Sequence, residues 1–163
     1  MPNNMKVLAI DPGVERVGIA VVEKIGGAKE TLIYSDCFKT SSKLPHPERL
    51  TLIGTEIARI IKEYKPQALA IEKLYFETNV TTAMAVSEAR GVILYEAARC
   101  GMPIFEYTPL EIKVAVTGYG KSDKKAVMYM VPKLIKLPDQ KMIDDEMDAI
   151  AIALTCFAHE KFV

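Results

Sequence analysis

Runs of apolar residues bounded by turn residues predict five strands in this chain. The first is KVLAI at 6–10, which ends at Asp11-Pro12-Gly13. Pro and Gly in these positions are typical of a strand end followed by a turn. Further strands are expected at 18–22, 31–38, 68–71 and 104–107. The first three predict an antiparallel meander, and the short apolar run at 68–71 predicts a buried strand parallel to the first.

A helical period replaces the strand pattern in five other segments. Leu50, Ile53, Ile57 and Ile60 share one face of a helix that ends before Pro66. A second helix is apolar on nearly all sides, so it needs burial against more than one surface. Its first residue, Asn79, is most simply a helix N-cap. The five helices are expected at 47–64, 79–99, 109–116, 123–136 and 144–160.

The order of these elements is β-β-β-α-β-α-β-α-α-α, which predicts an α/β fold. Three meandering strands followed by two βα units give one five-stranded mixed sheet, flanked by helices on both faces. The chain has 163 residues, a length that predicts a single domain spanning 1–163.

Composition excludes several classes of protein. Half of the residues are apolar and 26% are charged, which is ordinary for a globular domain and not for a disordered chain. The longest nearly apolar run, 149–158, is half the length that a bilayer requires, so no membrane association is expected. The three cysteines lack metal-ligand spacing, and no signal peptide is evident at the N-terminus, so a cytoplasmic location is expected.

Charge is balanced overall but unevenly distributed. There are 21 basic and 21 acidic residues, which excludes a globally basic nucleic-acid binder. Residues 112–136, however, contain six lysines and one acid, whereas 137–163 contain two lysines and six acids. A local phosphate-binding segment therefore remains possible beside an acidic one.

Four acids stand where a charge needs an explanation. Asp11 and Glu72 each follow an apolar strand, and these strands are predicted to be parallel neighbours. The carboxyl ends of such strands are where open α/β sheets place their sites. Asp145 and Asp148 are three residues apart, so they share one face of the last helix.

Asp11, Glu72 and Asp145 also have a purely structural interpretation. Asp11 could form an Asx turn in Asp-Pro-Gly. Asp145 lies in the first helical turn, where acids favour the helix dipole. A Glu after a strand is often a solvated loop residue. The pattern alone leaves both interpretations open.

If the four acids converge, they repel one another unless cations bind. A donor set made only of carboxylate oxygens suits Mg²⁺ or Mn²⁺. Two such ions can activate a water and stabilise the leaving oxygen of a phosphodiester. The neighbouring lysines would then bind the phosphate backbone.

With these features assembled, the chain resembles the RuvC family of bacterial Holliday junction resolvases, which are nucleases of RNase H-like fold. The matching stretches follow the family's order and spacing over nearly the whole chain: LAIDPGVERVGIAVV (8–22), LAIEKLYFETN (69–79), SEARGV (87–92), FEYTPLEIKVAVTGYGKSDKKAVMYMV (105–131), LIKLP (134–138) and DEMDAIAIAL (145–154).

The resemblance implies a role for each candidate residue. Asp11, Glu72, Asp145 and Asp148 would be catalytic carboxylates that hold two Mg²⁺ ions, with Mn²⁺ as a substitute. Some relatives carry His in place of Asp145.

The remaining implied positions bind DNA. Lys113 and Lys124 would face the DNA near the scissile phosphate. Tyr75 stands where the family carries an aromatic ring that packs against unpaired bases. Gly118 and Gly120 would allow close approach of the backbone to DNA, although glycines here could equally be plain turn residues.

The implied activity is a Mg²⁺-dependent crossover junction endodeoxyribonuclease that resolves four-way junctions in recombination and repair by paired symmetric nicks. The family acts as a homodimer and works with RuvA and RuvB. One alternative is another RNase H-like nuclease, such as a YqgF-like RNA-processing enzyme, although the TGYG segment and the lysines after it argue against it. Another is a junction-binding protein without chemistry, which the four acids oppose.

Overall fold

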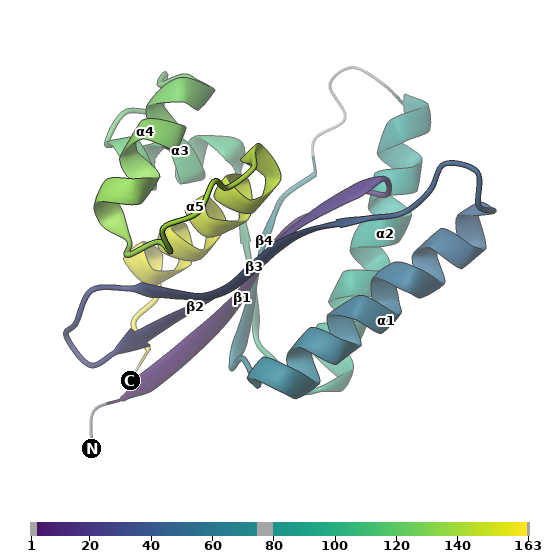
Figure 1. Ribbon diagram of the computed structural model, residues 1–163, viewed down its shortest axis with the longest axis horizontal. Helices are drawn as coiled ribbons and strands as arrows, with labels where there is room; N and C mark the ends of the chain where they lie inside the picture. Colours follow the sequence, from purple (N-terminus) through teal and green to yellow (C-terminus); the bar gives the residue numbers. More distant parts are fainter. Residues whose placement is uncertain (1–2, 75–79, 163) are drawn as a thin grey trace.

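The computed structural model describes residues 3–74 and 80–162, and these form one mixed sheet between two layers of helices (Figure 1). The strands are β1 (Asn4–Asp11), β2 (Arg16–Ile25), β3 (Thr31–Lys39), β4 (Ala68–Glu72) and β5 (Ile104–Tyr107). Their order across the sheet is β3-β2-β1-β4-β5. The meander β1-β2-β3 is antiparallel, whereas β4 runs parallel to both β1 and β5. The predicted five-stranded mixed sheet is confirmed.

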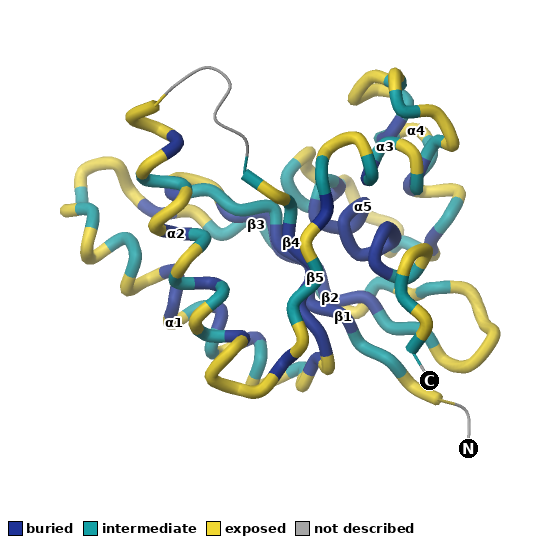
Figure 2. Tube along the Cα trace, turned by 180° about the vertical axis from the view of Figure 1, so that it is seen from behind, coloured by how far each residue is buried: buried dark blue, intermediate teal, exposed yellow. Residues whose placement is uncertain are grey.

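Helices cover both faces of this sheet, as expected. They are α1 (His46–Tyr64), α2 (Val80–Arg99), α3 (Pro109–Thr117), α4 (Lys124–Leu134) and α5 (Asp144–His159). Figure 1 shows α1 and α2 on one side and α3, α4 and α5 on the other. The central strands β1, β2 and β4 and the helix α5 contain most of the buried residues (Figure 2).

Two hydrophobic cores result, and alternation along the strands assigns each residue to one of them. In β1, Leu8 and Ile10 belong to the core beneath α1 and α2, whereas Val7 and Ala9 belong to the core beneath α5. Successive side chains of a strand point to opposite faces, so this assignment follows from the strand period of two. The next residue in the series, Asp11, therefore points to the α5 face.

Small residues line the strands beneath α5. Ala9, Ala20 and Ala70 are fully buried there, and α5 itself contributes Ala149 and further alanines to the same core. The opposite core is built from larger side chains, mostly isoleucine and leucine. With little side-chain bulk on either surface, α5 lies close to β1 and β2, its main partners in the sheet.

Gly18 marks the point of closest approach. A Cβ atom at this position would lie 2.2 Å from the carbonyl oxygen of Asp145 and 3.1 Å from the Cβ atom of Asp11. No side chain fits there without moving the first turn of α5. Gly18 faces Asp11 across the β1–β2 ladder, so the contact sets where α5 begins relative to the end of β1.

The fourth helix is shorter than its sequence pattern indicates. It was expected to continue to residue 136, but α4 ends at Leu134 and Ile135 is extended. The chain then pairs with the start of β3, where the backbone N–H of Leu32 donates to the carbonyl of Lys136 at 3.4 Å. This tertiary pairing replaces the last predicted turn of the helix. Pro132 within α4 also weakens that end of the helix.

The second helix is only partly covered. Ala89, Ile93 and Ala97 of α2 are fully buried, whereas Val80, Met84 and Tyr95 are 73%, 59% and 65% exposed. The sequence predicts that a second surface buries this helix. Among the described residues, no such surface covers these three side chains. Within those residues, no helix combines the length and the apolar character needed to cross a membrane.

We predict that Gly18→Ala destabilises the fold by about 1–3 kcal/mol, because the added methyl group overpacks the contact between β2 and α5. Gly91→Ala is the matched control. It lies inside α2, where an added Cβ meets no atom within 4 Å. That variant should gain about 0.5–1 kcal/mol from helix propensity. Urea denaturation measures both, and equal stability of the two variants would contradict the prediction.

Candidate active site at the carboxyl edge of the sheet

Two acids end neighbouring parallel strands, as the sequence predicts. Asp11 is the last residue of β1 and Glu72 is the last residue of β4. Ile10 lies opposite Ile71 in the ladder, so the two acids occupy equivalent positions at one edge. Glu72 follows Ala70 on the α5 face, just as Asp11 follows Ala9. Both carboxylates therefore project toward α5.

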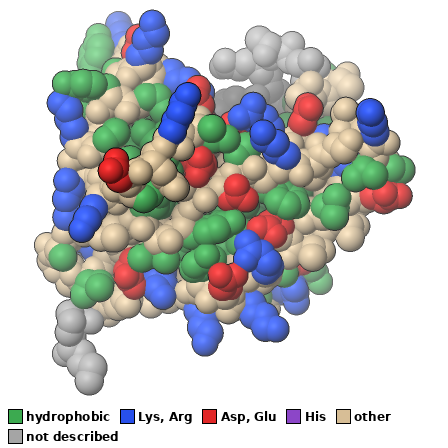
Figure 3. Space-filling model, in the orientation of Figure 1, with side chains coloured by type: hydrophobic (Ala, Val, Ile, Leu, Met, Phe, Trp, Pro, Cys, Tyr) green, Lys and Arg blue, Asp and Glu red, His purple; other side chains and the backbone are tan. Residues whose placement is uncertain are grey.

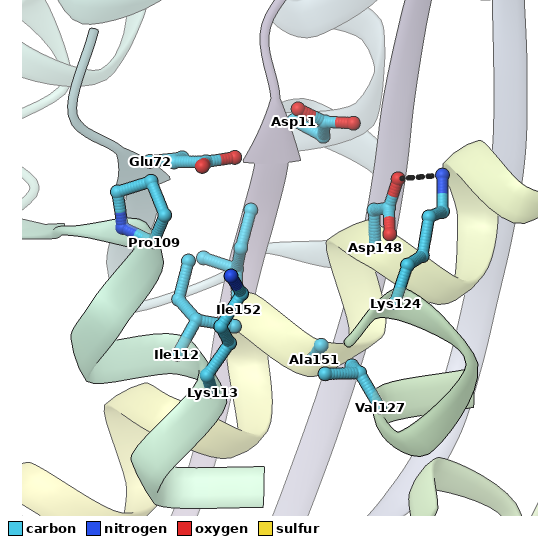
Figure 4. Close-up of a pocket in the computed structure, with 10 residues that line it drawn as sticks. All are labelled: Asp11, Glu72, Pro109, Ile112, Lys113, Lys124, Val127, Asp148, Ala151 and Ile152. Atoms are coloured by element: carbon cyan, nitrogen blue, oxygen red, sulfur yellow. Dashed lines mark hydrogen bonds and ion pairs between the residues drawn. The ribbon is translucent and has the colours of Figure 1, made fainter. Parts of the chain in front are cut away.

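These acids line a cavity of about 300 Å³ together with Asp148 from α5. Figure 4 shows the three carboxylates around the cavity, with Lys124 beside Asp148 and Lys113 reaching toward the cavity from α3. The polar lining is Asp11, Glu72, Lys113, Lys124 and Asp148, and the apolar walls are Pro109, Ile112, Val127, Ala151 and Ile152. A strand edge, two short helices and the sheet-facing helix α5 thus converge on one concave site.

Helix caps place the two lysines. Thr108 caps α3 by accepting a hydrogen bond from the N–H of Glu111 at 3.1 Å, and Glu111 accepts one from the N–H of Thr108 at 2.7 Å. This reciprocal capping fixes the start of the helix that carries Lys113. Asp123 caps α4 through the N–H of Ala126 at 2.8 Å, and Lys124 is the next residue.

The lysines partly balance the charge of the acids. The Nζ atom of Lys124 donates to Oδ2 of Asp148 at 3.3 Å (Figure 4). The positive charge of Lys113 acts on Glu72 and lowers the pKa of that carboxyl, but burial and the nearby Asp148 outweigh it and the pKa of Glu72 is raised. Burial likewise raises the pKa of Asp148 against the opposing effect of Lys124.

Asp11 is the most strongly perturbed of the acids. Burial, followed by the charges of Glu72, Asp148 and Asp145, raises its pKa from 3.8 to about 7. Each of these causes disfavours the ionised form. Buried acids that lie close together are stabilised either by taking up protons or by binding a cation.

The donor set fits a hard divalent cation. It consists of carboxylate oxygens, which Mg²⁺ and Mn²⁺ prefer, and the described residues add no thiol or imidazole to the lining. The carboxylates surround the cavity rather than converge on one point, since no three His, Cys, Asp or Glu among the described residues stand close enough to hold a metal ion.

Asp145 lies beside this cavity and not in its lining. Its Oδ2 atom accepts a hydrogen bond from Nη2 of Arg16 at 2.5 Å, and its charge contributes to the raised pKa of Asp11. Arg16 was not among the predicted site residues, because its partner is 129 residues away in the chain. The only local signal was the charged pair Glu15-Arg16 between Asp-Pro-Gly and the apolar run that follows.

A second contact holds the first turn of α5 against the sheet. Glu146 accepts a hydrogen bond from the hydroxyl of Ser35 on β3 at 2.7 Å, and it accepts another from the backbone N–H of Ile143 at 3.1 Å. The same carboxylate therefore caps α5 and ties it to the meander. Together with the Arg16–Asp145 pair, this contact positions the acids of α5.

The remaining candidate residues divide by location. Gly118 ends α3 with φ +78°, a conformation that glycine adopts without strain, and Gly120 packs against Leu110. Both glycines thus have structural roles in the turn that follows Lys113. Tyr75 and Asn79 lie outside the described residues, so their predicted roles in stacking and capping stay predictions.

We predict that Asp11 makes the fold less stable as pH rises from about 4 to 7. Its pKa is higher in the folded chain than the ordinary 3.8. The stability that its neutral carboxyl contributes is therefore present below about pH 4 and lost as it ionises. Asp11→Asn should match wild type near pH 4 and exceed it at pH 8 by up to about 4 kcal/mol. Urea denaturation in EDTA at both values measures this, and an unchanged difference would disprove it.

Comparisons with known proteins agree with this arrangement. The family model "Crossover junction endodeoxyribonuclease RuvC" matches residues 7–156. A protein of that name from Desulfitobacterium hafniense is 45% identical over 155 residues, which cover 95% of this chain and 93% of the relative. Its counterpart from Alkaliphilus metalliredigens is 46% identical over the same shares of both chains.

Solved structures extend the similarity to three dimensions. Thermus thermophilus RuvC in complex with Holliday junction substrate matches with a TM-score of 0.88 and 32% identity, over 95% of this chain and 94% of that one. The yeast mitochondrial Holliday junction resolvase Ydc2 is 12% identical with a TM-score of 0.69 over 94% of this chain and 78% of that one, and shares the fold. The cavity thus lies in a chain that matches one family in sequence and structure: this protein belongs to the RuvC family of crossover junction endodeoxyribonucleases.

Proposed function

We propose that this protein is an endonuclease that resolves Holliday junctions by paired symmetric nicks. The observation that carries the proposal is the cavity where Asp11, Glu72 and Asp148 face Lys113 and Lys124. Membership of a nuclease family, over nearly the full length of the chain, supplies the class of reaction. The relative solved with Holliday junction substrate supports four-way junction DNA as the substrate.

The carboxylates would hold two divalent cations, with Mg²⁺ as the expected metal and Mn²⁺ as a substitute. Asp11, Glu72 and Asp148 supply ligands from three elements, and Asp145 adds a fourth carboxylate beside Arg16. When bound, such a pair lowers the pKa of a water and stabilises the leaving oxygen of a phosphodiester. Asp11 must lose its proton to serve as a ligand, and its raised pKa makes cation binding favour higher pH.

The lysines would bind the DNA backbone. Lys113 and Lys124 line the same cavity as the acids, so a phosphate that entered it would meet positive charge as well as the carboxylate site (Figure 4). Lys124 contacts Asp148 at 3.3 Å, and a phosphate would compete with that carboxylate for its ammonium group. Gly118 and Gly120 would let the backbone of the turn between α3 and α4 approach the DNA strand closely.

A homodimer would account for paired nicks, because each chain carries one such cavity. The exposed Val80, Met84 and Tyr95 of α2 support this, since a second copy could cover the side that the chain's own elements leave open. We also propose that residues 1–163 form one RNase H-like domain. The protein would act in the cytoplasm, together with RuvA and RuvB.

A nicking assay on an end-labelled four-way junction, with and without Mg²⁺, tests the proposal. Symmetric nicks that require the metal and spare a linear duplex support it. Junction binding without cleavage under any metal would favour a binding protein instead. Cleavage of RNA in preference to the junction would favour an RNA-processing nuclease.

Removing a carboxylate from the cavity should abolish cutting and spare binding. Asp11→Asn, Glu72→Gln and Asp148→Asn should each lower the nicking rate by more than about 100-fold, because metal ligation and phosphate binding rest on different side chains. Asp145→Asn should be the mildest, since Asp145 lies outside the lining.

The matched control is Asp144→Asn. Asp144 also lies in the first turn of α5, but its side chain is 75% exposed and contacts Lys124 at 3.6 Å. Gel-shift and cleavage assays use the same preparations. Near-normal cutting by the Asp11 or Glu72 variant would contradict the site.

Replacing a cavity lysine should reduce the salt dependence of junction binding. Each of Lys113→Ala and Lys124→Ala should lower the slope of log affinity against log salt by roughly 1 if it removes one phosphate contact. Lys62→Ala serves as the control, because Lys62 is exposed on α1, across the sheet from the cavity. Fluorescence anisotropy at several salt concentrations measures the slopes. An unchanged slope in both cavity variants would argue against phosphate binding there.

A further inference from the structure

The turn between α3 and α4 displays a tyrosine to solvent. Tyr119 stands between Gly118 and Gly120 and is 61% exposed. An exposed aromatic ring on a turn gains nothing from the hydrophobic core, so burial does not explain its presence.

Hydrogen bonds hold this turn in one conformation. The N–H of Tyr119 donates to Oγ1 of Thr117 at 3.1 Å, and the carbonyl of Tyr119 accepts from the N–H of Ser122 at 3.1 Å. The hydroxyl of Thr117 also lies 2.9 Å from Oγ of Ser122. Both backbone groups of Tyr119 are therefore engaged, and only its own side-chain torsions remain free. A ring presented in this way loses little entropy when it binds a ligand.

The ring continues into a small apolar patch. Leu110 and Val114 on α3 are 59% and 46% exposed. Gly120 connects them to the turn, since a Cβ on Gly120 would lie 2.5 Å from Cδ1 of Leu110 and 3.4 Å from Cγ2 of Val114. The patch therefore offers apolar contact beside the turn that carries the ring.

Positive charge surrounds this patch. Lys121 lies in the same turn, while Lys113 and Lys124, in the helices on either side of it, line the candidate active site. The only acid in the segment 112–136 is Asp123, which is engaged as the cap of α4. Figure 3 shows lysine side chains among apolar ones in the region of α4. An apolar ring among lysines suits a ligand that combines phosphates with flat aromatic surfaces.

We propose that Tyr119 stacks on an unpaired nucleobase of the DNA strand that enters the cavity. In a duplex, neighbouring bases already cover one another's faces, so the ring selects a base that has left the stack. This inference rests on the proposed function, and it adds a base contact on the turn, separate from the aromatic position at Tyr75.

The absence of tryptophan from the chain allows a direct test. Tyr119→Trp introduces the only indole, whose emission should be quenched when a four-way junction binds in EDTA. The control is Tyr129→Trp on α4, in the same basic segment. Tyr129 is 64% exposed, but Nζ of Lys133 lies 4.0 Å from its ring centroid. Emission from the control variant should change little, and a duplex of the same sequence should quench neither.

Binding by two further variants completes the test. Tyr119→Ala should weaken junction binding by about 5- to 100-fold, which corresponds to one lost base–aromatic stack. Tyr119→Phe keeps the ring and should bind like wild type. Melting temperatures of both should match wild type, because the ring lies outside the core.

The outcomes separate this inference from the proposed function. If the wild-type chain neither binds nor nicks the junction, the proposed function fails. If it does both and Tyr119→Trp emission is unchanged at saturation, only the stacking inference is overturned, and the ring is left for a protein partner. Equal quenching by duplex and junction also overturns it, as does an Ala variant that binds normally.

Discussion

The close contact between α5 and the strands beneath it is the constraint on which the site depends. Alanines on both surfaces and the bare backbone at Gly18 let the helix settle directly over the ends of β1 and β2. Asp148 can then face Asp11 and Glu72 across a cavity of about 300 Å³. A larger side chain at any of these strand positions would hold the helix away and separate the acids. The small residues thus allow the close approach that the site requires, whereas the large residues fill the opposite core.

The cost of that proximity is electrostatic. Burial is the largest cause of the raised pKa of each of the three carboxyls in the cavity, and the charges of nearby acids add to it. The chain offsets part of this cost with Lys113, Lys124 and Arg16. Each of these cations stands beside an acid without enclosing it, so the carboxylates keep oxygens available for a metal. The ionised carboxylates of the cavity therefore lower the stability of the fold at the place where a cation would bind.

Sequence patterns predicted the elements that depend on local periodicity. All five strands and all five helices were located, and the strand-end positions of Asp11 and Glu72 followed from the same apolar runs.

What could not be predicted were contacts between distant segments. The pairing of Lys136 with Leu32 shortens α4, and the partners of Arg16 and Ser35 lie more than 100 residues away. No local pattern encodes such pairs. The membership of Asp148, but not Asp145, in the cavity lining likewise depends on how α5 is rotated.

The alternation in β1 has a consequence for how such chains can diverge. A single-residue deletion or insertion within the strand would exchange its two faces and deliver the final carboxylate to the α1–α2 core. The turn after β2, where Gly26 has φ +54°, lies away from that register. Length changes in this turn would therefore leave the register of β1 unchanged, whereas length changes within β1 would not. The position of the Asp11 carboxylate is thus set by the residue count of β1 and is independent of the length of the β2–β3 turn.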